Sequence, residues 1–226
     1  MHTIEIYKSI QGESTFAGLP CIFVRLAGCN LRCTWCDSEY TFSGGTKMTL
    51  DEVMAEITKL SPVKLVEITG GEPMLQEREA VPLMERLLAE RYRVLLETSG
   101  ERPLANVPKA VHKIVDVKCP GSGEGGTFLG ENLQHLGQND EVKFVLADRA
   151  DYEFAREFVR ENGLESKAGA VLFSPAFRKD AGPARDAANC LLDPRILVEW
   201  MLEDGLNARL GLQLHKFVWA PLTKGV

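Results

Sequence analysis

The run AGCNLRCTWCDSEY, residues 27–40, determines how the rest of this chain is interpreted. Its cysteines Cys29, Cys33 and Cys36 follow the spacing C-x3-C-x2-C. Thiolates spaced in this way can bind three irons of a [4Fe–4S] cluster and leave the fourth iron without a protein ligand. Such an open iron can bind a small molecule and pass an electron to it. The run therefore predicts an iron–sulfur site that acts on a bound ligand.

The remaining cysteines do not support a zinc knuckle or a disulfide framework. Cys21, Cys119 and Cys190 are scattered singly, and no second C-x2-C pair or H-x3-H follows the cluster run. Four-cysteine zinc sites usually contain two such pairs. The chain shows no secretory signal, so we expect a cytoplasmic protein whose thiols stay reduced. A cluster is therefore favoured over zinc.

The composition is that of an ordinary globular chain. With 226 residues, 45% of them hydrophobic and 26% charged, the chain can form one sizeable core, and we expect a single domain over residues 1–226. No apolar run approaches the length of a membrane span. The net charge is −6, and no cluster of Lys and Arg stands out. We therefore expect neither a membrane nor nucleic acid as a partner.

Apolar, β-rich runs alternate with helical patterns along the chain. Repeated strand–helix–strand units indicate an α/β fold with a mainly parallel sheet. The expected strands are 3–9, 21–28, 64–69, 93–98, 112–118, 141–147, 170–174 and 208–214. The expected helices are 49–60, which begins with a capping box at Thr49 and Glu52, 77–91, 148–162, and a helix that starts at Asp193-Pro194 and ends before Gly205.

Unusual residues follow these strands rather than precede them. In parallel α/β folds the functional groups gather at the carboxyl ends of the strands. We therefore expect one functional rim. The segments that should meet there are the cluster run, TGGEP at 69–73, ETSG at 97–100, KCPGSG at 118–123, SPAF at 174–177 and QLHK at 213–216.

The segment Thr69-Gly70-Gly71-Glu72-Pro73 forms a second motif about thirty residues after the cysteines. Its two glycines let the backbone approach a ligand closely. Together with C-x3-C-x2-C it resembles the motif with which radical S-adenosylmethionine (SAM) enzymes receive the amino group of SAM. In that superfamily the open iron is chelated by the amino and carboxylate groups of SAM. The resemblance implies a partial, incomplete β/α barrel with the first strand outside it.

Further runs resemble the 7-carboxy-7-deazaguanine synthases of queuosine and 7-deazapurine biosynthesis. They are SIQGE at 9–13, FVRLAGCN at 23–30, ETSG, DVKCPG at 116–121 and QLHK. The resemblance implies a lyase that rearranges 6-carboxy-5,6,7,8-tetrahydropterin to 7-carboxy-7-deazaguanine with loss of ammonia. It also implies a [4Fe–4S] cluster, SAM and Mg²⁺ as cofactors, an external electron donor such as a flavodoxin, and a homodimer.

The same resemblance implies roles for individual residues. Gln11 and Glu13 suit the amide and amino edge of a pterin, and Arg25 suits its carboxylate. Ser38 would contribute a hydroxyl to Mg²⁺. The expected substrate contacts are Ile10, Gln11, Gly12, Glu13, Arg25, Thr69, His215 and Pro221. The expected SAM contacts are Trp35, Cys36, Asp37, Gly71, Glu72, Asp116, Val117, Lys118, Ser174, Pro175, Ala176 and Phe177.

Two alternatives stay open at this point. A small radical SAM activase, which places a glycyl radical on a partner enzyme, shares the cysteine spacing and the short chain. A non-enzymatic module with structural zinc or an electron-transfer cluster would need no SAM. The chain also continues for five residues beyond Pro221, whereas some relatives end there and use the terminal carboxylate at the substrate.

Overall fold

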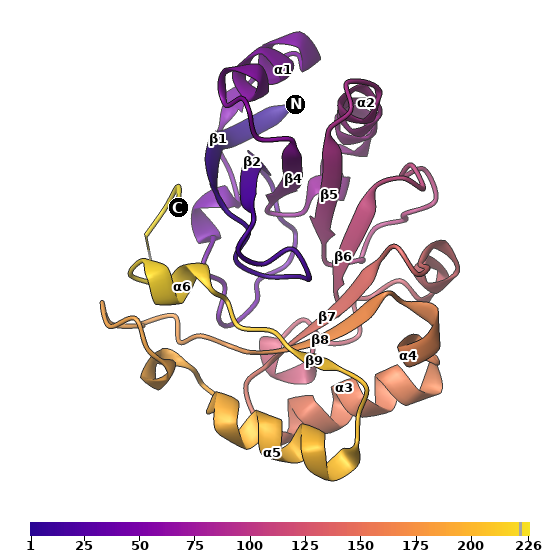
Figure 1. Ribbon diagram of the computed structural model, residues 1–226, viewed down its shortest axis with the longest axis vertical. Helices are drawn as coiled ribbons and strands as arrows, with labels where there is room; N and C mark the ends of the chain where they lie inside the picture. The colour runs from indigo at the N-terminus through magenta and orange to yellow at the C-terminus, as the bar shows by residue number, and fades with distance from the viewer. Residues whose placement is uncertain (222) are drawn as a thin grey trace.

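The described residues, 1–221 and 223–226 of a computed structural model, form a nine-stranded sheet with helices along its outer side (Figure 1). The strands are β1 (His2–Ile10), β2 (Pro20–Leu26), β3 (Thr46–Lys47), β4 (Leu65–Gly70), β5 (Arg93–Thr98), β6 (His112–Asp116), β7 (Glu141–Leu146), β8 (Ala170–Pro175) and β9 (Arg209–Leu210). The helices are α1 (Leu50–Lys59), α2 (Glu77–Ala89), α3 (Arg149–Glu161), α4 (Leu164–Lys167), α5 (Pro194–Asp204) and α6 (His215–Val218).

The sheet is open and almost entirely parallel. Its order is β3-β1-β2-β4-β5-β6-β7-β8-β9, and every pair from β2 to β9 is parallel. β1 runs antiparallel to both β2 and β3, so it stands outside the series of parallel units. Strands β3 and β9 are the two edges, and the sheet curves without closing (Figure 1). The expected α/β fold and incomplete barrel are confirmed.

The helix boundaries follow the local signals in the sequence. α1 begins at Thr49 with the capping box, in which Thr49 and Glu52 bond each other's backbone N–H groups. Asp193 caps α5 through its side chain, and Gly205 ends that helix at φ +59°. Gly163 follows α3 at φ +60°. A left-handed conformation of this kind costs glycine little, which is why these helices stop where they do.

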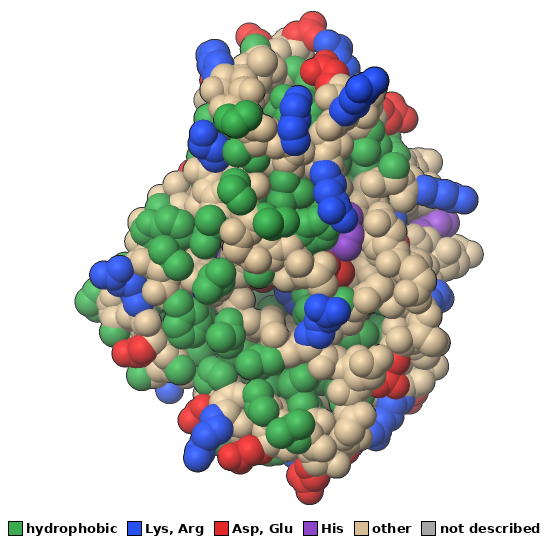
Figure 2. Space-filling model, in the orientation of Figure 1, with side chains coloured by type: hydrophobic (Ala, Val, Ile, Leu, Met, Phe, Trp, Pro, Cys, Tyr) green, Lys and Arg blue, Asp and Glu red, His purple; other side chains and the backbone are tan. Residues whose placement is uncertain are grey.

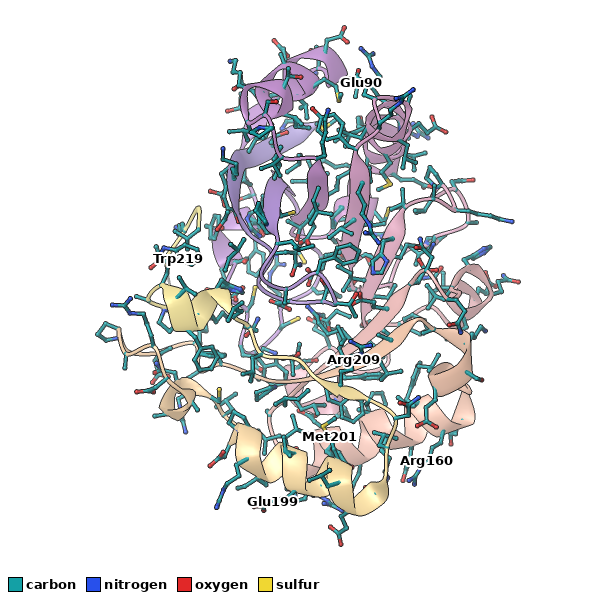
Figure 3. The ribbon with its side chains drawn as sticks, in the orientation of Figure 1. Glu90, Arg160, Glu199, Met201, Arg209 and Trp219 are labelled. Carbon is teal, nitrogen blue, oxygen red and sulfur yellow. The ribbon has the colours of Figure 1, made fainter. Side chains whose placement is uncertain are left out.

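Hydrophobic side chains pack on both sides of the sheet. The larger core lies between the sheet and the helices. There Met201 of α5 points to the sheet, while Glu199 points away (Figure 3). A smaller core on the concave side consists of Phe16, Cys21, Phe23, Leu65, Leu95 and Ile114. Phe16 belongs to the β1–β2 loop, so this loop packs against the side chains of β2, β4, β5 and β6 in the smaller core.

The final strand is much shorter than the expected range 208–214. Only Arg209 and Leu210 pair with β8, and Gly211 still donates to the Phe173 carbonyl at 2.8 Å. The chain then leaves the sheet, and the Leu214 N–H donates to the Gly12 carbonyl at 2.7 Å. The expected strand was wrong because this contact with the N-terminal loop replaces further pairing with β8.

The surface of the face in Figure 2 carries hydrophobic side chains over its lower middle, with charged side chains toward its ends. Exposed large hydrophobic residues of the C-terminal segment include Leu210, Leu212 and Val218. None of the helices in the described part of the chain combines the length and apolar character needed to cross a bilayer.

Candidate active site

A pocket opens at the carboxyl ends of the parallel strands, and it brings together the segments that the sequence placed on one rim. Three cysteines of the cluster run line it, together with the ends of β4, β5 and β6 and the segment around α6. The β1–β2 loop contributes Gln11, Gly12 and Glu13. Residues separated by most of the chain therefore share one cavity, as expected for the functional face of such a sheet.

The glycines of the TGGEP motif let β4 approach the cluster loop. A Cβ on Gly70 would lie 2.2 Å from the Leu26 carbonyl oxygen, and one on Gly71 would lie 2.1 Å from the Gly28 carbonyl oxygen. Real side chains do not tolerate such contacts. The Glu72 N–H donates to that same Gly28 carbonyl at 2.8 Å. These glycines thus hold the loop that carries Cys29 against the sheet.

The cluster loop is also braced from the other side. Thr34 donates its N–H to the Ser122 carbonyl and its hydroxyl to the Gly121 carbonyl, each at 2.9 Å. The KCPGSG turn that supplies these carbonyls is itself fixed by Asp151, which accepts the Gly121 N–H at 2.7 Å. Cys33 lies between the two braced ends of the loop, so its position is fixed by the fold.

The three thiols are partly buried, and burial raises the pKa of Cys33 to about 11 in the absence of metal. Iron binding must therefore displace its proton. In the described residues, no three His, Cys, Asp or Glu side chains converge on a single-ion site. A [4Fe–4S] cluster needs no such convergence, because each thiolate binds a different iron.

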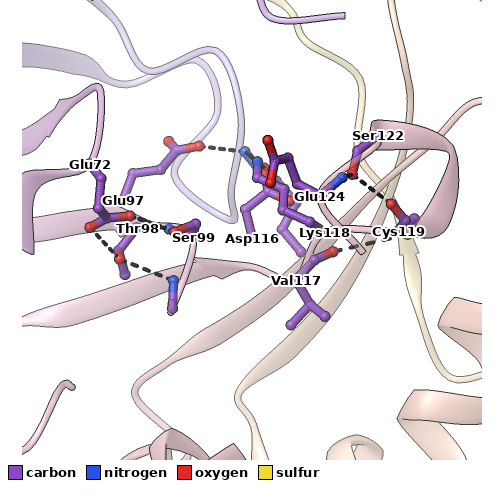
Figure 4. A network of polar contacts seen from close by, with 12 residues as sticks. Glu72, Glu97, Thr98, Ser99, Asp116, Val117, Lys118, Cys119, Ser122 and Glu124 are labelled. Atoms are coloured by element: carbon purple, nitrogen blue, oxygen red, sulfur yellow. Dashed lines mark hydrogen bonds and ion pairs between the residues drawn. The ribbon is translucent and has the colours of Figure 1, made fainter. Parts of the chain in front are cut away.

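Glu72 links the ends of β4 and β5 (Figure 4). Its carboxylate is buried and accepts the Met74 N–H at 2.9 Å, the Thr98 hydroxyl at 2.8 Å, and the Ser99 N–H and hydroxyl at 2.8 and 2.7 Å. Both oxygens therefore have protein donors. The geometry gives Glu72 a structural task in addition to its place in the pocket wall.

A buried lysine lies at the bottom of the pocket. Lys143 on β7 is 3% exposed, and its Nζ lies 2.6 Å from Glu13 Oε2 and in contact with the Glu97 carboxylate. Asp116 Oδ2 is 3.8 Å from the same Nζ and 2.7 Å from Lys118 Nζ. Burial alone would lower the pKa of Lys143, but the surrounding carboxylates raise it well above the ordinary value. Lys143 is therefore a permanent cation.

The N-terminal loop and the C-terminal segment meet in the pocket. Gln213 Nε2 donates to Glu13 Oε1 at 2.8 Å. The ring of His215 lies against Gly12, where a Cβ would come within 2.1 Å of Nδ1. Burial lowers the pKa of His215, so the ring is neutral near pH 7. These contacts make the C-terminal segment a wall of the substrate cavity.

Two charged groups near the mouth have protein partners of their own. Arg25 donates from Nε to Glu5 at 2.9 Å and from Nη2 to the Tyr7 hydroxyl at 2.8 Å. Asp37 Oδ2 lies 2.6 Å from Lys216 Nζ, and its Oδ1 accepts the Ser38 hydroxyl at 2.9 Å. Arg25 therefore keeps only part of its donor set for a ligand.

Most of the expected site residues line this pocket, including Trp35, Ser38, Thr69, Asp116, Lys118, Phe177, His215 and Pro221. Four expected SAM contacts do not line it. They are Val117, Ser174, Pro175 and Ala176, and all of them are buried.

Sequence reasoning missed several groups in the pocket. Glu67, Lys143, Gln213 and Lys216 all line it, and none was among the expected contacts. A usable signal was present for the first two. In LVEITG and EVKFVL, Glu67 and Lys143 each stand between two fully buried apolar residues. Successive side chains of a strand point to opposite faces of the sheet, so this alternation places both charged residues on the concave side.

Comparison with known proteins gives one consistent answer. Residues 24–168 match the model of the Radical SAM superfamily. The chain is 68% identical to a 7-carboxy-7-deazaguanine synthase of Koribacter versatilis over all of both chains. It is 42% identical to the synthase of Chlorobaculum tepidum, covering 98% of this chain and 96% of that protein. The fold resembles the crystal structure of QueE from Escherichia coli, with TM-score 0.73 and 23% identity over 95% and 94% of the two chains.

Proposed function

The chain belongs to the 7-carboxy-7-deazaguanine synthases of the radical SAM superfamily, and we propose that it converts 6-carboxy-5,6,7,8-tetrahydropterin to 7-carboxy-7-deazaguanine with loss of ammonia. The observation that carries this proposal is the full-length identity of 68% to a synthase of that name. The pocket adds chemical support, since three thiols, several carboxylates and an arginine face one cavity. The glycyl-radical activase and zinc-module alternatives are not favoured.

The residues present fit the cofactors that the superfamily implies. Cys29, Cys33 and Cys36 would hold the [4Fe–4S] cluster at the pocket mouth. Asp116 Oδ1 is buried and has no hydrogen-bond partner among the residues that the structure describes. An unpaired carboxylate oxygen at a pocket wall is costly, and a ligand hydroxyl such as a SAM ribose hydroxyl would satisfy it. When bound, the cluster and SAM supply the 5′-deoxyadenosyl radical that starts the rearrangement.

The protein's own part is to bind and orient the pterin. Gln11 and Glu13 offer acceptors and a donor to its amide and amino edge, and Arg25 offers its remaining N–H groups to the carboxylate. Thr69 and His215 complete the wall. Ser38 lies on the same rim, where its hydroxyl together with the substrate carboxylate suits Mg²⁺, which prefers oxygen ligands.

We further propose that the whole chain acts as one radical SAM domain and that it works as a homodimer in the cytoplasm. Reduction of the cluster requires an external electron donor such as a flavodoxin. Size-exclusion chromatography with light scattering would give the mass of the reconstituted protein in solution. A mass of one chain would contradict the dimer.

An anaerobic turnover experiment tests the proposed function. The reconstituted protein is mixed with SAM, a reductant, Mg²⁺ and 6-carboxytetrahydropterin, and products are followed by mass spectrometry. A product lighter by one ammonia, formed over many turnovers per SAM consumed, is the expected result. Cleavage of SAM to 5′-deoxyadenosine without that product would overturn the substrate assignment and favour the activase. A matched reaction without Mg²⁺ tests the metal, and equal rates with and without it would contradict the metal site.

A further inference from the structure

We propose that Lys143 is a positioning residue of this site, which holds Glu13 as an anion in one fixed orientation toward the substrate. The inference rests on the proposed function, because it concerns how the pocket presents Glu13 to a pterin. Lys143 itself need not touch the substrate. Its effect on the reaction passes through the carboxylate that it binds.

The geometry of the Glu13 carboxylate supports this assignment. Lys143 Nζ holds Oε2 at 2.6 Å, and Gln213 Nε2 holds Oε1 at 2.8 Å. The two partners come from β7 and from the segment before α6, so they fix the carboxylate from two directions. The backbone is fixed as well, because the Glu13 N–H donates to the Gln11 side chain. Glu13 therefore has little freedom to rotate away from the cavity that it lines.

The other neighbours of Lys143 fix its side chain in place beside Glu13. It also binds Glu97 of β5, and Asp116 of β6 lies 3.8 Å away, so contacts with two neighbouring strands set its position. Glu97 and Glu67 compete with Glu13 for this cation. Burial raises the pKa of Glu97 and that of Glu67, which disfavours the anion at both positions and weakens their competition with Glu13.

The charge state of Glu13 depends on this arrangement. Burial would raise its pKa, but Lys143, His215 and hydrogen bonds from Lys143 and Gln213 outweigh it and set the pKa at about 2. Without Lys143, the titratable groups that still face Glu13 are His215, whose pKa is lowered by burial, and the carboxyl groups of Glu67 and Glu97. Of these groups in the described part of the chain, only His215 can carry a positive charge, and its burial opposes that charge.

A fixed anion at this position selects a substrate edge that carries N–H donors. The amide and amino groups of a pterin present such an edge. A carboxyl group that can rotate, or that carries a proton, would accept these donors poorly. Lys143 therefore contributes to substrate recognition and to the precision with which the pterin is held near the cluster.

The test compares Lys143→Met with Lys113→Met in the reconstituted protein. Lys113 is a matched control, because it is 4% exposed and pairs with Asp140 at 2.9 Å, but it does not line the pocket. Binding of 6-carboxytetrahydropterin is measured by anaerobic calorimetry with SAM present and reductant absent, between pH 5.5 and pH 8.5. Turnover then separates KM from kcat.

Lys143→Met should weaken binding about 10- to 100-fold at the acid end of this range, the loss expected for a hydrogen bond to a charged group. The loss should shrink as pH rises and Glu13 ionises, and it should appear mainly in KM. Glu13→Gln should weaken binding without this pH dependence. Adding Lys143→Met to Glu13→Gln should cost no further affinity, because the positioning effect has already been lost.

Two results would overturn the inference. One is a loss in Lys143→Met that equals the loss in Lys113→Met at every pH, which would make Lys143 only a stabilising buried charge. The other is a further loss when Lys143→Met is added to Glu13→Gln. Wild-type protein that does not bind or convert the pterin would instead refute the proposed function, so the two failures are distinguishable.

Discussion

Replacing Gly71 with Ala should displace the cluster loop. The backbone of Gly71 is not in the left-handed region, so the substitution adds a methyl group without adding backbone strain. That methyl group would lie 2.1 Å from the Gly28 carbonyl oxygen, 2.6 Å from its carbon and 2.9 Å from Cys29 Cβ. The prediction therefore isolates one steric contact between the two motifs.

The size of the effect follows from these distances. An ordinary contact needs 3.4 Å, so the two backbones must separate by about 1.3 Å. Overpacking of this kind costs about 1–3 kcal/mol. The separation also breaks the 2.8 Å hydrogen bond from the Glu72 N–H to the Gly28 carbonyl, which adds about 1 kcal/mol. For a chain of this size we expect the melting temperature to fall by roughly 5–15 °C.

The assay measures bound iron, the absorbance of the reconstituted cluster and the melting temperature of the apoprotein. Gly130→Ala is the matched control, because no atom of residues 1–221 or 223–226 lies within 4 Å of its added Cβ and its φ is not in the left-handed region. The control should bind iron as the wild type does. Wild-type iron content and melting temperature in Gly71→Ala would refute the steric argument and leave ligand approach as the reason for this glycine.

Three further changes test other parts of the site. Cys33→Ala should abolish the cluster and all SAM cleavage, and iron content above background together with turnover would contradict the ligand assignment. Asp151→Asn should cost about 1–3 kcal/mol in urea unfolding, because Asp151 accepts the Gly121 N–H on one oxygen and the Ala147 N–H on the other, and an Asn amide has only one oxygen for these two donors; unchanged stability would show that the KCPGSG turn needs no such anchor. Burial would raise the pKa of Glu141, but hydrogen bonds from His112 and Thr15 lower it below 4.5. Its contribution to stability is thus full above that pH and is lost as pH falls through the folded pKa, so Glu141→Gln should flatten the fall in unfolding free energy between pH 5 and pH 3, and an unchanged slope would contradict this account.

The sequence was most informative where the signal is local. The spacing of Cys29, Cys33 and Cys36, the capping box at Thr49 and the glycines after α3 and α5 each depend on neighbouring residues, and the described fold confirms the helices and the α/β class. The strand ends could also be placed on one rim, because parallel strands share a direction.

Contacts between distant segments could not be predicted in the same way. Gly71 was expected to make room for a ligand, yet the closest atoms to its Cβ belong to the cluster loop. Lys143 was expected only as part of the strand 141–147, whereas its side chain faces a polar cavity. The length of β9 depended on a hydrogen bond between Leu214 and Gly12, and no local pattern specifies that partner.

The contact between the β1–β2 loop and the segment before α6 has a consequence for the order in which the pocket forms during synthesis. The hydrogen bond from Gln213 to Glu13 spans 200 residues, and the ion pair from Lys143 to Glu13 spans 130. Contacts over such separations form late, because a long loop must close before they contribute. A nascent chain can therefore complete the cluster loop and most of the sheet before it can complete the pterin cavity. The site for the substrate is complete only after the segment that carries Gln213 and His215 has been synthesised and has folded against the β1–β2 loop.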